Sequence, residues 1–328
     1  MEVENRIIEG ANFIKITNST GLEVILSDFG AGIYSIKLNG APMLTGLKNY
    51  KDWMNSNAYN GKTVGRIAGR LPSEGLHFQG KTYPISHNEG DHTLHGGVKG
   101  FSFSFFKMDV RQNDADIYVD FYLHSPEADQ GFPGDVTLRV RYVLPEKENK
   151  LRIEYKVQAD KDTPISLTNH SYFNLGASDD VLQDSLYVDS DEILTYDSKL
   201  IPQGYRKIPE FMDVSSPKLV KEMVRNEYLK QTNGLDTAFH KQDRNKNEAH
   251  IILENEYYKA IIKSSYDDVV VYSSNYPPFE QDLSNGKKSK LYGALAIEPQ
   301  YEAFDFERMR VSPNKEQRNF IEYEFIEK

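Results

Sequence analysis

A histidine flanked by amide and hydroxyl side chains is the feature of this chain best suited to chemistry. His170 stands in the run Thr168–Leu175, with Asn169 before it and Ser171 after it. Such neighbours can fix the tautomer of an imidazole, and the unperturbed pKa of histidine, about 6.5, suits proton transfer near neutral pH. Read alone, His170 fits a buried histidine whose hydrogen bonds are satisfied by Asn169 or Ser171 better than it fits a catalytic group.

Three further segments carry residues that bind polar groups or transfer protons. They are Val64–Arg70, with two arginines between glycines; Thr93–Gly97, with a histidine on a glycine-rich loop; and Ala294–Gln300, with a glutamate after an apolar run. Desolvation beside an apolar run raises the pKa of a carboxylate towards the range useful for a general base. Glu298 alone fits equally well as a strand-end carboxylate paired with a surface arginine, and His95 alone fits a solvated loop histidine.

Taken together and in this order, these segments resemble the aldose 1-epimerase (galactose mutarotase) family. The runs NHSYFNL at 169–175 and TLHGG at 93–97 are specific, and weaker similarity appears at Gly30–Ile33, Gly131–Gly134 and Gly234–Asp236. The resemblance implies a large antiparallel β-sandwich of the galactose mutarotase type. It also implies an isomerase that interconverts the α and β anomers of a free aldose of the glucose or galactose kind.

The resemblance assigns the two proton-transfer roles of that reaction. Glu298 is expected to be the base that removes the proton from the anomeric hydroxyl. His170 is expected to be the acid that protonates the ring oxygen as the C1–O5 bond breaks. One carboxylate and one imidazole suffice for opening and closing the ring, so neither a metal nor another cofactor is expected.

The resemblance also implies a set of substrate contacts. His95 matches a hydrogen-bond donor to the ring or carbonyl oxygen, and Arg70 matches an arginine whose fixed donors hold sugar hydroxyls. Asp236 matches an aspartate that accepts hydrogen bonds from sugar hydroxyls. Tyr272 matches an aromatic residue that packs on the pyranose, and it fits equally well as a core aromatic of a strand. Arg66 is expected to be structural.

Three positions depart from the family pattern. Gly69 precedes Arg70 where the family often has asparagine, and Thr237 follows Asp236 where histidine is usual. The loop at residues 299–306, after Glu298, also differs. These departures bear on the partners of Arg70 and on which hydroxyl pattern the pocket prefers.

The elements that must position these residues are strands. Apolar residues alternate with polar ones in Ile117–Leu123, Leu138–Leu144, Leu151–Val157 and Ile321–Phe325, as expected for antiparallel strands with one buried face. Turns are expected at 145–149, Asn39–Gly40, Gln79–Gly80 and Asn285–Gly286. One helix is predicted, capped by Ser216, with Pro217 in its first turn. The sequence therefore predicts an all-β sandwich with few short helices.

Bulk properties narrow the class of protein. With 328 residues, the chain is expected to form one domain, 1–328, since large β-sandwiches exceed the usual ~100–200 residues per domain. The net charge of −10 disfavours a nucleic-acid partner, which needs a basic face. The absence of cysteine excludes disulfides and thiolate sites. The acidic start, Met1–Asn5, has no signal or membrane-spanning pattern, so we expect a cytoplasmic protein off the membrane.

A metal site on one loop is an alternative reading. His87, Glu89, Asp91, His92 and His95 supply suitable ligand types. The glycine-rich loop gives them no fixed spacing, which disfavours such a site.

Other functions of the same pocket also remain open. Asp236 and Glu298 could serve as the two carboxylates of a glycoside hydrolase, which would leave both histidines without a role. A sugar-binding protein without catalysis is the main non-enzyme alternative. An epimerase for a hexose phosphate would require added basic residues at the pocket mouth, and none is evident from spacing. The reducing end of a disaccharide is a further possible substrate.

Overall fold

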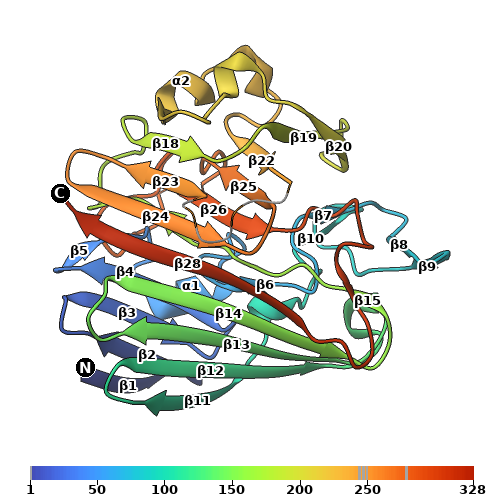
Figure 1. The fold of residues 1–328 in the computed structure, drawn as a ribbon, viewed down its shortest axis with the longest axis horizontal. Helices are drawn as coiled ribbons and strands as arrows, with labels where there is room; N and C mark the ends of the chain where they lie inside the picture. Colours follow the sequence, from blue (N-terminus) through green and yellow to red (C-terminus); the bar gives the residue numbers. More distant parts are fainter. Residues whose placement is uncertain (1, 243–244, 246–247, 249, 278–279) are drawn as a thin grey trace.

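Nine antiparallel strands form the largest sheet of the computed structural model, which describes residues 2–242, 245, 248, 250–277 and 280–328. In spatial order its strands are β11 (Lys107–Gln112), β12 (Asp116–Ser125), β13 (Val136–Pro145), β14 (Lys150–Ala159), β28 (Gln317–Glu327), β24 (Tyr258–Ser264), β23 (Ile251–Glu254), β18 (Ser185–Val188) and β21 (Lys218–Leu219). This sheet forms the front layer in Figure 1.

Two smaller sheets form the layer behind it. The five-stranded sheet contains β1 (Glu2–Ile8), β2 (Ala11–Thr17), β3 (Leu22–Ser27), β4 (Gly32–Leu38) and β5 (Ala41–Pro42). The six-stranded sheet contains, in spatial order, β17 (Tyr172–Phe173), β26 (Leu295–Gln300), β25 (Asp268–Tyr272), β22 (Asp236–His240), β19 (Glu192–Tyr196) and β20 (Pro202–Lys207). A bridge between Leu44 and Phe173 connects the two. Buried apolar side chains of all three sheets belong to one core cluster, as in a β-sandwich.

Short strand pairs and helices complete the described part of the chain. The pairs are β6 (Thr63–Val64) with β16 (Thr168–Asn169), β7 (Arg70–Leu71) with β10 (Thr93–Leu94), β8 (Leu76–Phe78) with β9 (Lys81–Tyr83), and β15 (Thr163–Pro164) with β27 (Arg310–Val311). The helices are α1 (Tyr50–Asn55), α2 (Val220–Val224) and the 3₁₀ turns Phe101–Phe103, Asp129–Gly131, Glu210–Met212 and Glu227–Leu229. Among the described residues, none of these helices has the length and apolar character needed to cross a bilayer.

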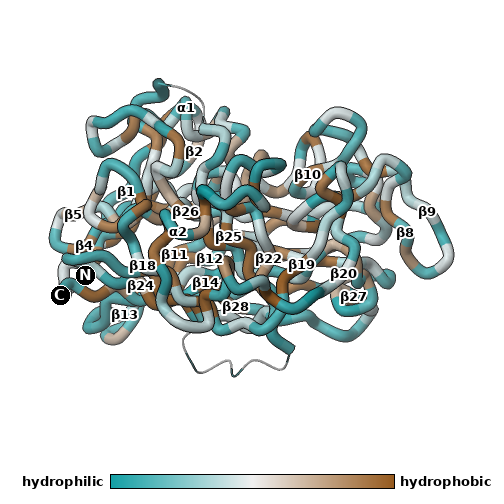
Figure 2. The backbone as a smooth tube through the Cα atoms, turned by 90° about the horizontal axis from the view of Figure 1, so that it is seen from above, coloured by the Kyte–Doolittle hydropathy of each residue, from teal (hydrophilic) through white to brown (hydrophobic). Residues whose placement is uncertain are grey.

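The predicted alternation decides which face of each long strand is buried. Val140 lies opposite Tyr155 and Tyr142 opposite Ile153, and all four side chains are buried in the core. In Figure 2 the hydrophobic segments follow the strands in the middle of the molecule, and hydrophilic segments form the outer loops. The four strands predicted from their alternation are thus confirmed as parts of β12, β13, β14 and β28.

One polar residue of these strands is buried against expectation. Asp120 was expected on the solvated face of β12, yet it is fully buried. Arg141 on the next strand donates to its carboxylate through Nε at 2.7 Å and Nη2 at 2.9 Å, and Arg111 on the other neighbour also donates to it. Asp120 is therefore covered by arginine side chains, which satisfy its charge.

The predicted helix is shorter than expected. Helix α2 begins at Val220 with Leu219 at its N-cap, and Ser216 is not the cap. Lys218–Leu219 form strand β21 and pair with β18, which leaves Pro217 before a strand instead of inside a helix. Backbone pairing with the sheet thus replaces the first helical turn. The predicted turns at Asn39–Gly40 and Gln79–Gly80 are confirmed, with positive φ at both residues of each.

Candidate active site

A cavity of about 620 Å³ opens over the six-stranded sheet. Consecutive neighbouring strands contribute Glu298 (β26), Tyr272 (β25), Asp236 (β22) and Tyr196 (β19) to its lining. Loops before and after these strands supply the remaining wall. Its size is within the range of small-molecule pockets, roughly 300–1,000 Å³. The structure brings all six sequence-predicted site residues to this cavity.

His170 is held in place through its backbone. It follows strand β16; its N–H donates to the carbonyl of Lys62 at 3.0 Å, and its carbonyl accepts from the N–H of Gly61 at 2.7 Å. Asn169 and Ser171 do not hydrogen-bond to the imidazole: Ser171 Oγ donates to Asn169 Oδ1 at 2.6 Å, and Asn169 Nδ2 donates to Gly61. Among the described residues, the buried imidazole Nδ1 has no hydrogen-bond partner. The flanking residues therefore fix the backbone and leave the ring available.

Glu298 faces this imidazole from the interior of a strand. Its Oε1 lies 3.3 Å from His170 Nε2, and both side chains are almost fully buried. The alternative considered for Glu298, a strand-end carboxylate paired with a surface arginine, does not apply, because β26 continues to Gln300 and all its residues are buried. Burial, reinforced by the nearby negative charge of Asp236, raises the pKa of Glu298 well above its usual value. Burial lowers the pKa of His170 to about 4.

His95 completes a cluster of three ionisable groups. It adopts φ 52°, and its Nδ1 accepts a hydrogen bond from the N–H of Gly69 at 3.2 Å. Burial, the neighbouring His170 and Arg70 lower the pKa of His95 well below 6.5, so the ring is neutral. A neutral imidazole that accepts at Nδ1 carries its proton on Nε2. His95 is therefore a hydrogen-bond donor on its free side.

Two tyrosines enclose the histidines. The ring of Tyr59 lies 4.8 Å from that of His95 and 5.9 Å from that of His170, centroid to centroid. The ring of Tyr172 lies 5.0 Å from that of His170. Neither tyrosine was singled out from the sequence as a site residue, since strand-like aromatic residues are common throughout this chain.

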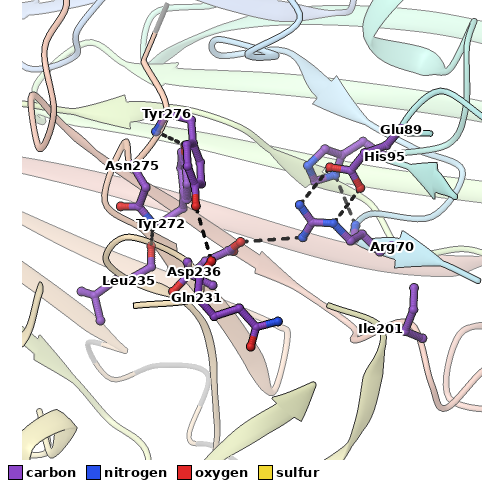
Figure 3. A network of polar contacts seen from close by, with 12 residues as sticks. Arg70, Glu89, His95, Ile201, Gln231, Leu235, Asp236, Tyr272, Asn275 and Tyr276 are labelled. Carbon is purple, nitrogen blue, oxygen red and sulfur yellow. Dashed lines mark hydrogen bonds and ion pairs between the residues drawn. The ribbon is translucent and has the colours of Figure 1, made fainter. Parts of the chain in front are cut away.

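An arginine between two carboxylates forms the adjacent wall (Figure 3). Arg70 donates to Glu89 through Nε at 2.7 Å and Nη2 at 3.0 Å, and its Nη1 lies 3.7 Å from Asp236 Oδ2. Desolvation raises the pKa of Asp236, and Arg70 opposes that rise. Glu89 was considered as a metal ligand from the sequence, and its actual partner is Arg70. The bidentate contact orients the guanidinium and leaves Nη1 directed towards Asp236.

Tyr272 lines the cavity next to Asp236 (Figure 3). Its hydroxyl oxygen accepts a hydrogen bond from the N–H of Tyr276 at 3.1 Å, which fixes the ring. The side chain is partly exposed, so it is not an aromatic residue of the closed core.

Arg66 lies outside the cavity lining and is structural, as expected. Its guanidinium donates to the carbonyls of Ser125, Pro126, Pro133 and Gly134 and to the hydroxyl of Ser125, at 2.8–2.9 Å. The side chain is buried, and its role is to join the loop at 125–134 to the segment that carries Arg70.

Three residues of the site have the donor types that could hold a metal ion. Donor atoms of His95, His170 and Glu298 lie within 4.8 Å of one another. Among the described residues, no other group of three or more potential metal ligands is this close together. The alternative cluster at 87–95 is not brought together there. The same three side chains can act in proton transfer, since a neutral imidazole and a carboxylic acid at 3.3 Å share a proton.

Several residues that line the cavity were not predicted from the sequence. Three lysines at the mouth each pair with an aspartate: Lys287 with Asp179 at 2.6 Å, Lys288 with Asp282 at 2.7 Å and Lys290 with Asp180 at 3.1 Å. The lysines stand close together at 287–290, so a basic cluster at the mouth could have been predicted from the sequence. Asp179 and Asp180 come from a distant segment, whereas Asp282 is a local partner of Lys288. Glu302 was noted only as part of a divergent loop, and it lines the cavity.

Known proteins share both the sequence pattern and the fold. The family model described as aldose 1-epimerase matches residues 12–319. The aldose 1-epimerase of Escherichia coli (strain K12) is 31% identical over 275 residues, covering 80% of this chain and 78% of that protein. A crystal structure of an aldose epimerase homologue from C. elegans is 29% identical with a TM-score of 0.86, covering 97% and 99% of the two chains. A galactose 1-epimerase from Lactobacillus acidophilus shares the fold with a TM-score of 0.89, at 24% identity over 99% of each chain. The chain therefore belongs to the aldose 1-epimerase family of enzymes.

Proposed function

We propose that this chain interconverts the anomers of a free aldose with Glu298 as general base and His170 as general acid. Glu298 takes the proton of the anomeric hydroxyl while His170 protonates the ring oxygen, and the C1–O5 bond breaks. Rotation about C1–C2 presents the other face of the aldehyde, and the same groups close the ring. The 3.3 Å contact between His170 Nε2 and Glu298 Oε1 carries this proposal, because it puts acid and base within reach of two oxygens on one carbon.

The proton count of the pair is conserved in this mechanism. Before ring opening, Glu298 is a carboxylate and His170 an imidazolium; afterwards Glu298 is protonated and His170 neutral. Burial raises the pKa of Glu298 and lowers that of His170, so the uncharged arrangement is favoured. Ring opening converts the charged arrangement into the uncharged one. Burial of the pair therefore favours the proton transfers that break the C1–O5 bond.

The remaining groups would hold the sugar during the reaction. We assign His95 Nε2–H as a donor to the ring oxygen or the aldehyde oxygen. Arg70 and Asp236 would bind the hydroxyls on the opposite side of the ring, and Tyr272 would pack on its face. These contacts would retain the open chain until the ring closes.

A neutral aldose of the glucose or galactose type is the proposed substrate. The three lysines at the cavity mouth are each paired with an aspartate, so they offer little net positive charge to a phosphate. The cavity of about 620 Å³ exceeds a single sugar, since twelve heavy atoms occupy less than the ~360 Å³ of twelve water molecules. The reducing end of a disaccharide therefore also fits this proposal.

Polarimetry of freshly dissolved α-glucose, α-galactose and maltose tests the proposal. The wild-type protein should accelerate the change in optical rotation for at least one sugar, and Glu298→Gln should not. Calorimetric binding of a sugar without any acceleration would instead establish the non-catalytic binding protein. An acceleration restricted to hexose phosphates would overturn the choice of substrate while leaving the proton-transfer pair in place.

The proposed catalyst is a single domain over residues 1–328. One apolar cluster includes side chains of both layers, from Ile14 in β2 of the five-stranded sheet to Phe325 in β28 of the nine-stranded sheet, which supports cooperative folding. A single calorimetric unfolding transition is the expected result, and two separable transitions would contradict it.

A further inference from the structure

Glu302 is a buried carboxyl group of the cavity that the proposed mechanism does not use. It lies two residues beyond the end of β26, is 4% exposed, and lines the cavity. Its Oε1 accepts a hydrogen bond from Gln300 Nε2 at 2.9 Å. In the part of the chain that the structure describes, the carboxyl group of Glu302 has no other hydrogen-bond partner. Burial of a polar group in this position costs free energy of folding unless a ligand or a water molecule forms a hydrogen bond with it.

The position facing Glu302 is a glycine. Gly69 has φ +87°, and a Cβ placed there would lie 3.6 Å from Gln300 Nε2, 3.8 Å from Ala303 Cβ and 4.0 Å from Glu302 Oε2. The family pattern that the sequence resembles often has asparagine at this position, and an asparagine side chain would extend from that Cβ. Two of the departures from the family pattern, Gly69 and the loop after β26, are therefore neighbours in the structure. Position 69 has no polar side chain, and the carboxyl group of Glu302 lies next to it.

The surroundings of Glu302 match a neutral hydroxyl better than an anion. Burial, with the nearby Asp268, raises its pKa to about 8, so near neutral pH it is a carboxylic acid with one donor and one free acceptor. A sugar hydroxyl has the same combination. Asp236 also acts electrostatically on Glu302, and it carries negative charge into the same region. An anionic sugar substituent would be repelled there.

We propose that Glu302 is a specificity-determining substrate contact, whose carboxyl group binds a ring hydroxyl of a neutral aldose beside Gly69, where no side chain fills the space. This inference rests on the proposed function, since it assumes that the cavity holds an aldose. It adds a residue that sets which hydroxyl pattern is preferred, and it requires no change in the proton-transfer pair.

Steady-state polarimetry with galactose, glucose and their monodeoxy analogues tests the role of Glu302. Glu302→Leu should raise KM about 10-fold with kcat within a factor of about two, because it removes a hydrogen bond made to substrate and transition state alike. The variant should also lose discrimination against one monodeoxy sugar, the one that lacks the hydroxyl bound by Glu302. Glu302→Gln keeps a donor and an acceptor, so it should retain that discrimination.

A second substitution provides a rescue that a merely structural role would not give. Asparagine is among the residues that best tolerate positive φ, and the Cβ contacts at position 69 are of ordinary van der Waals length. Gly69→Asn added to Glu302→Leu should lower KM again and restore the lost discrimination. Asp184→Asn is the matched control, because Asp184 is also a buried carboxyl group with a raised pKa but does not line the cavity. It should leave KM and the monodeoxy panel unchanged.

Unchanged KM values and an unchanged monodeoxy panel for Glu302→Leu would overturn the inference. If that variant does not fold, Glu302→Asp replaces it: the carboxyl group retreats by one methylene and should raise KM in the same direction. Absence of mutarotation by the wild-type protein would refute the proposed function separately. The same sugar panel measured by calorimetric binding would then still decide whether Glu302 contacts the ring.

Discussion

His170 Nε2 and Glu298 Oε1 lie 3.3 Å apart where both side chains are almost fully buried. Each group also keeps one buried atom, His170 Nδ1 and Glu298 Oε2, without a partner among the described residues. Buried polar atoms are rarely left unsatisfied in structural ion pairs. The two unpartnered atoms support our proposal that the pair exchanges protons with oxygens of the sugar.

Removal of either proton-transfer group should affect turnover more than binding. Glu298→Gln and His170→Asn should each lower kcat roughly 10²–10⁴-fold, equivalent to about 3–5 kcal/mol of barrier. KM for the sugar should change much less, since both replacements keep a polar side chain of similar size. Polarimetric kcat values and calorimetric sugar affinities measure the two effects separately. Near-native kcat in both variants would contradict the assigned roles.

Activity should depend on pH because the proposed mechanism requires Glu298 and His170 to hold one proton between them. A second proton binds below the lowered pKa of His170, about 4, and the rate should fall there. The proton is lost above the raised pKa of Glu298, so the rate should also fall on the alkaline side. Between these limits the rate should be nearly constant after subtraction of the uncatalysed reaction.

The position of the alkaline limb offers a further check on this assignment. Asp236 raises the pKa of Glu298 by its negative charge. Asp236→Asn should therefore lower the pKa of Glu298 and shift the alkaline limb towards lower pH. A profile centred on an unshifted histidine pKa near 6.5 would be inconsistent with the buried pair.

Loss of the Asp236 carboxylate should weaken sugar binding. Asp236→Ala removes a charged acceptor proposed to contact hydroxyls in both ground and transition states, so KM should rise roughly 10- to 100-fold. Turnover at saturating sugar should persist, in contrast to Glu298→Gln. A structure with bound aldose provides the direct measurement. Finding both Arg70 and Asp236 beyond hydrogen-bond reach of the sugar would refute this part of the site.

Arg66 should matter for stability and not for the chemistry. Arg66→Met would leave four buried carbonyl groups between Ser125 and Gly134 without their donor, at a cost of about 3–5 kcal/mol. The midpoint of thermal unfolding, Tm, should fall by on the order of 10 °C. Arg318→Met is the matched control, since the Arg318 side chain is 67% exposed and its loss should change stability by less than about 0.5 kcal/mol. A similar Tm for both variants would contradict the structural role.

The sequence predicts best those features that follow from local periodicity. Strands β12, β13, β14 and β28 were evident because a buried face imposes alternation at every second residue. The start of α2 was missed because Lys218–Leu219 pair with residues of β18 that lie 32 and 34 positions earlier in the sequence, Leu186 and Ser185. Tertiary pairing of this kind overrides capping preferences, and the local sequence does not encode it.

The site, like the fold, contains residues that the sequence predicts and contacts that it does not. Short motifs mark His95, His170 and Glu298, and family resemblance adds Arg70, Asp236 and Tyr272, all of which line the cavity. The pairs Arg70–Glu89, Lys287–Asp179 and Lys290–Asp180 depend on contacts between residues that are 19 to 110 positions apart. So does the approach of Glu302 to Gly69, which joins two departures that are separate in the sequence. Spacing along the chain cannot reveal such contacts.

The position of β28 in the nine-stranded sheet determines the order in which the strands of this protein can pair during folding. β28 pairs with β14 on one side and β24 on the other (Figure 1), so residues 317–327 join the two halves of the nine-stranded sheet. During synthesis, β14 leaves the ribosome long before its partner is made and presents an open edge to other chains. The sheet can close only after translation has reached β28. Recombinant production should therefore be most vulnerable to aggregation before β28 has emerged, when lower temperature or a chaperone that covers strand edges would help most.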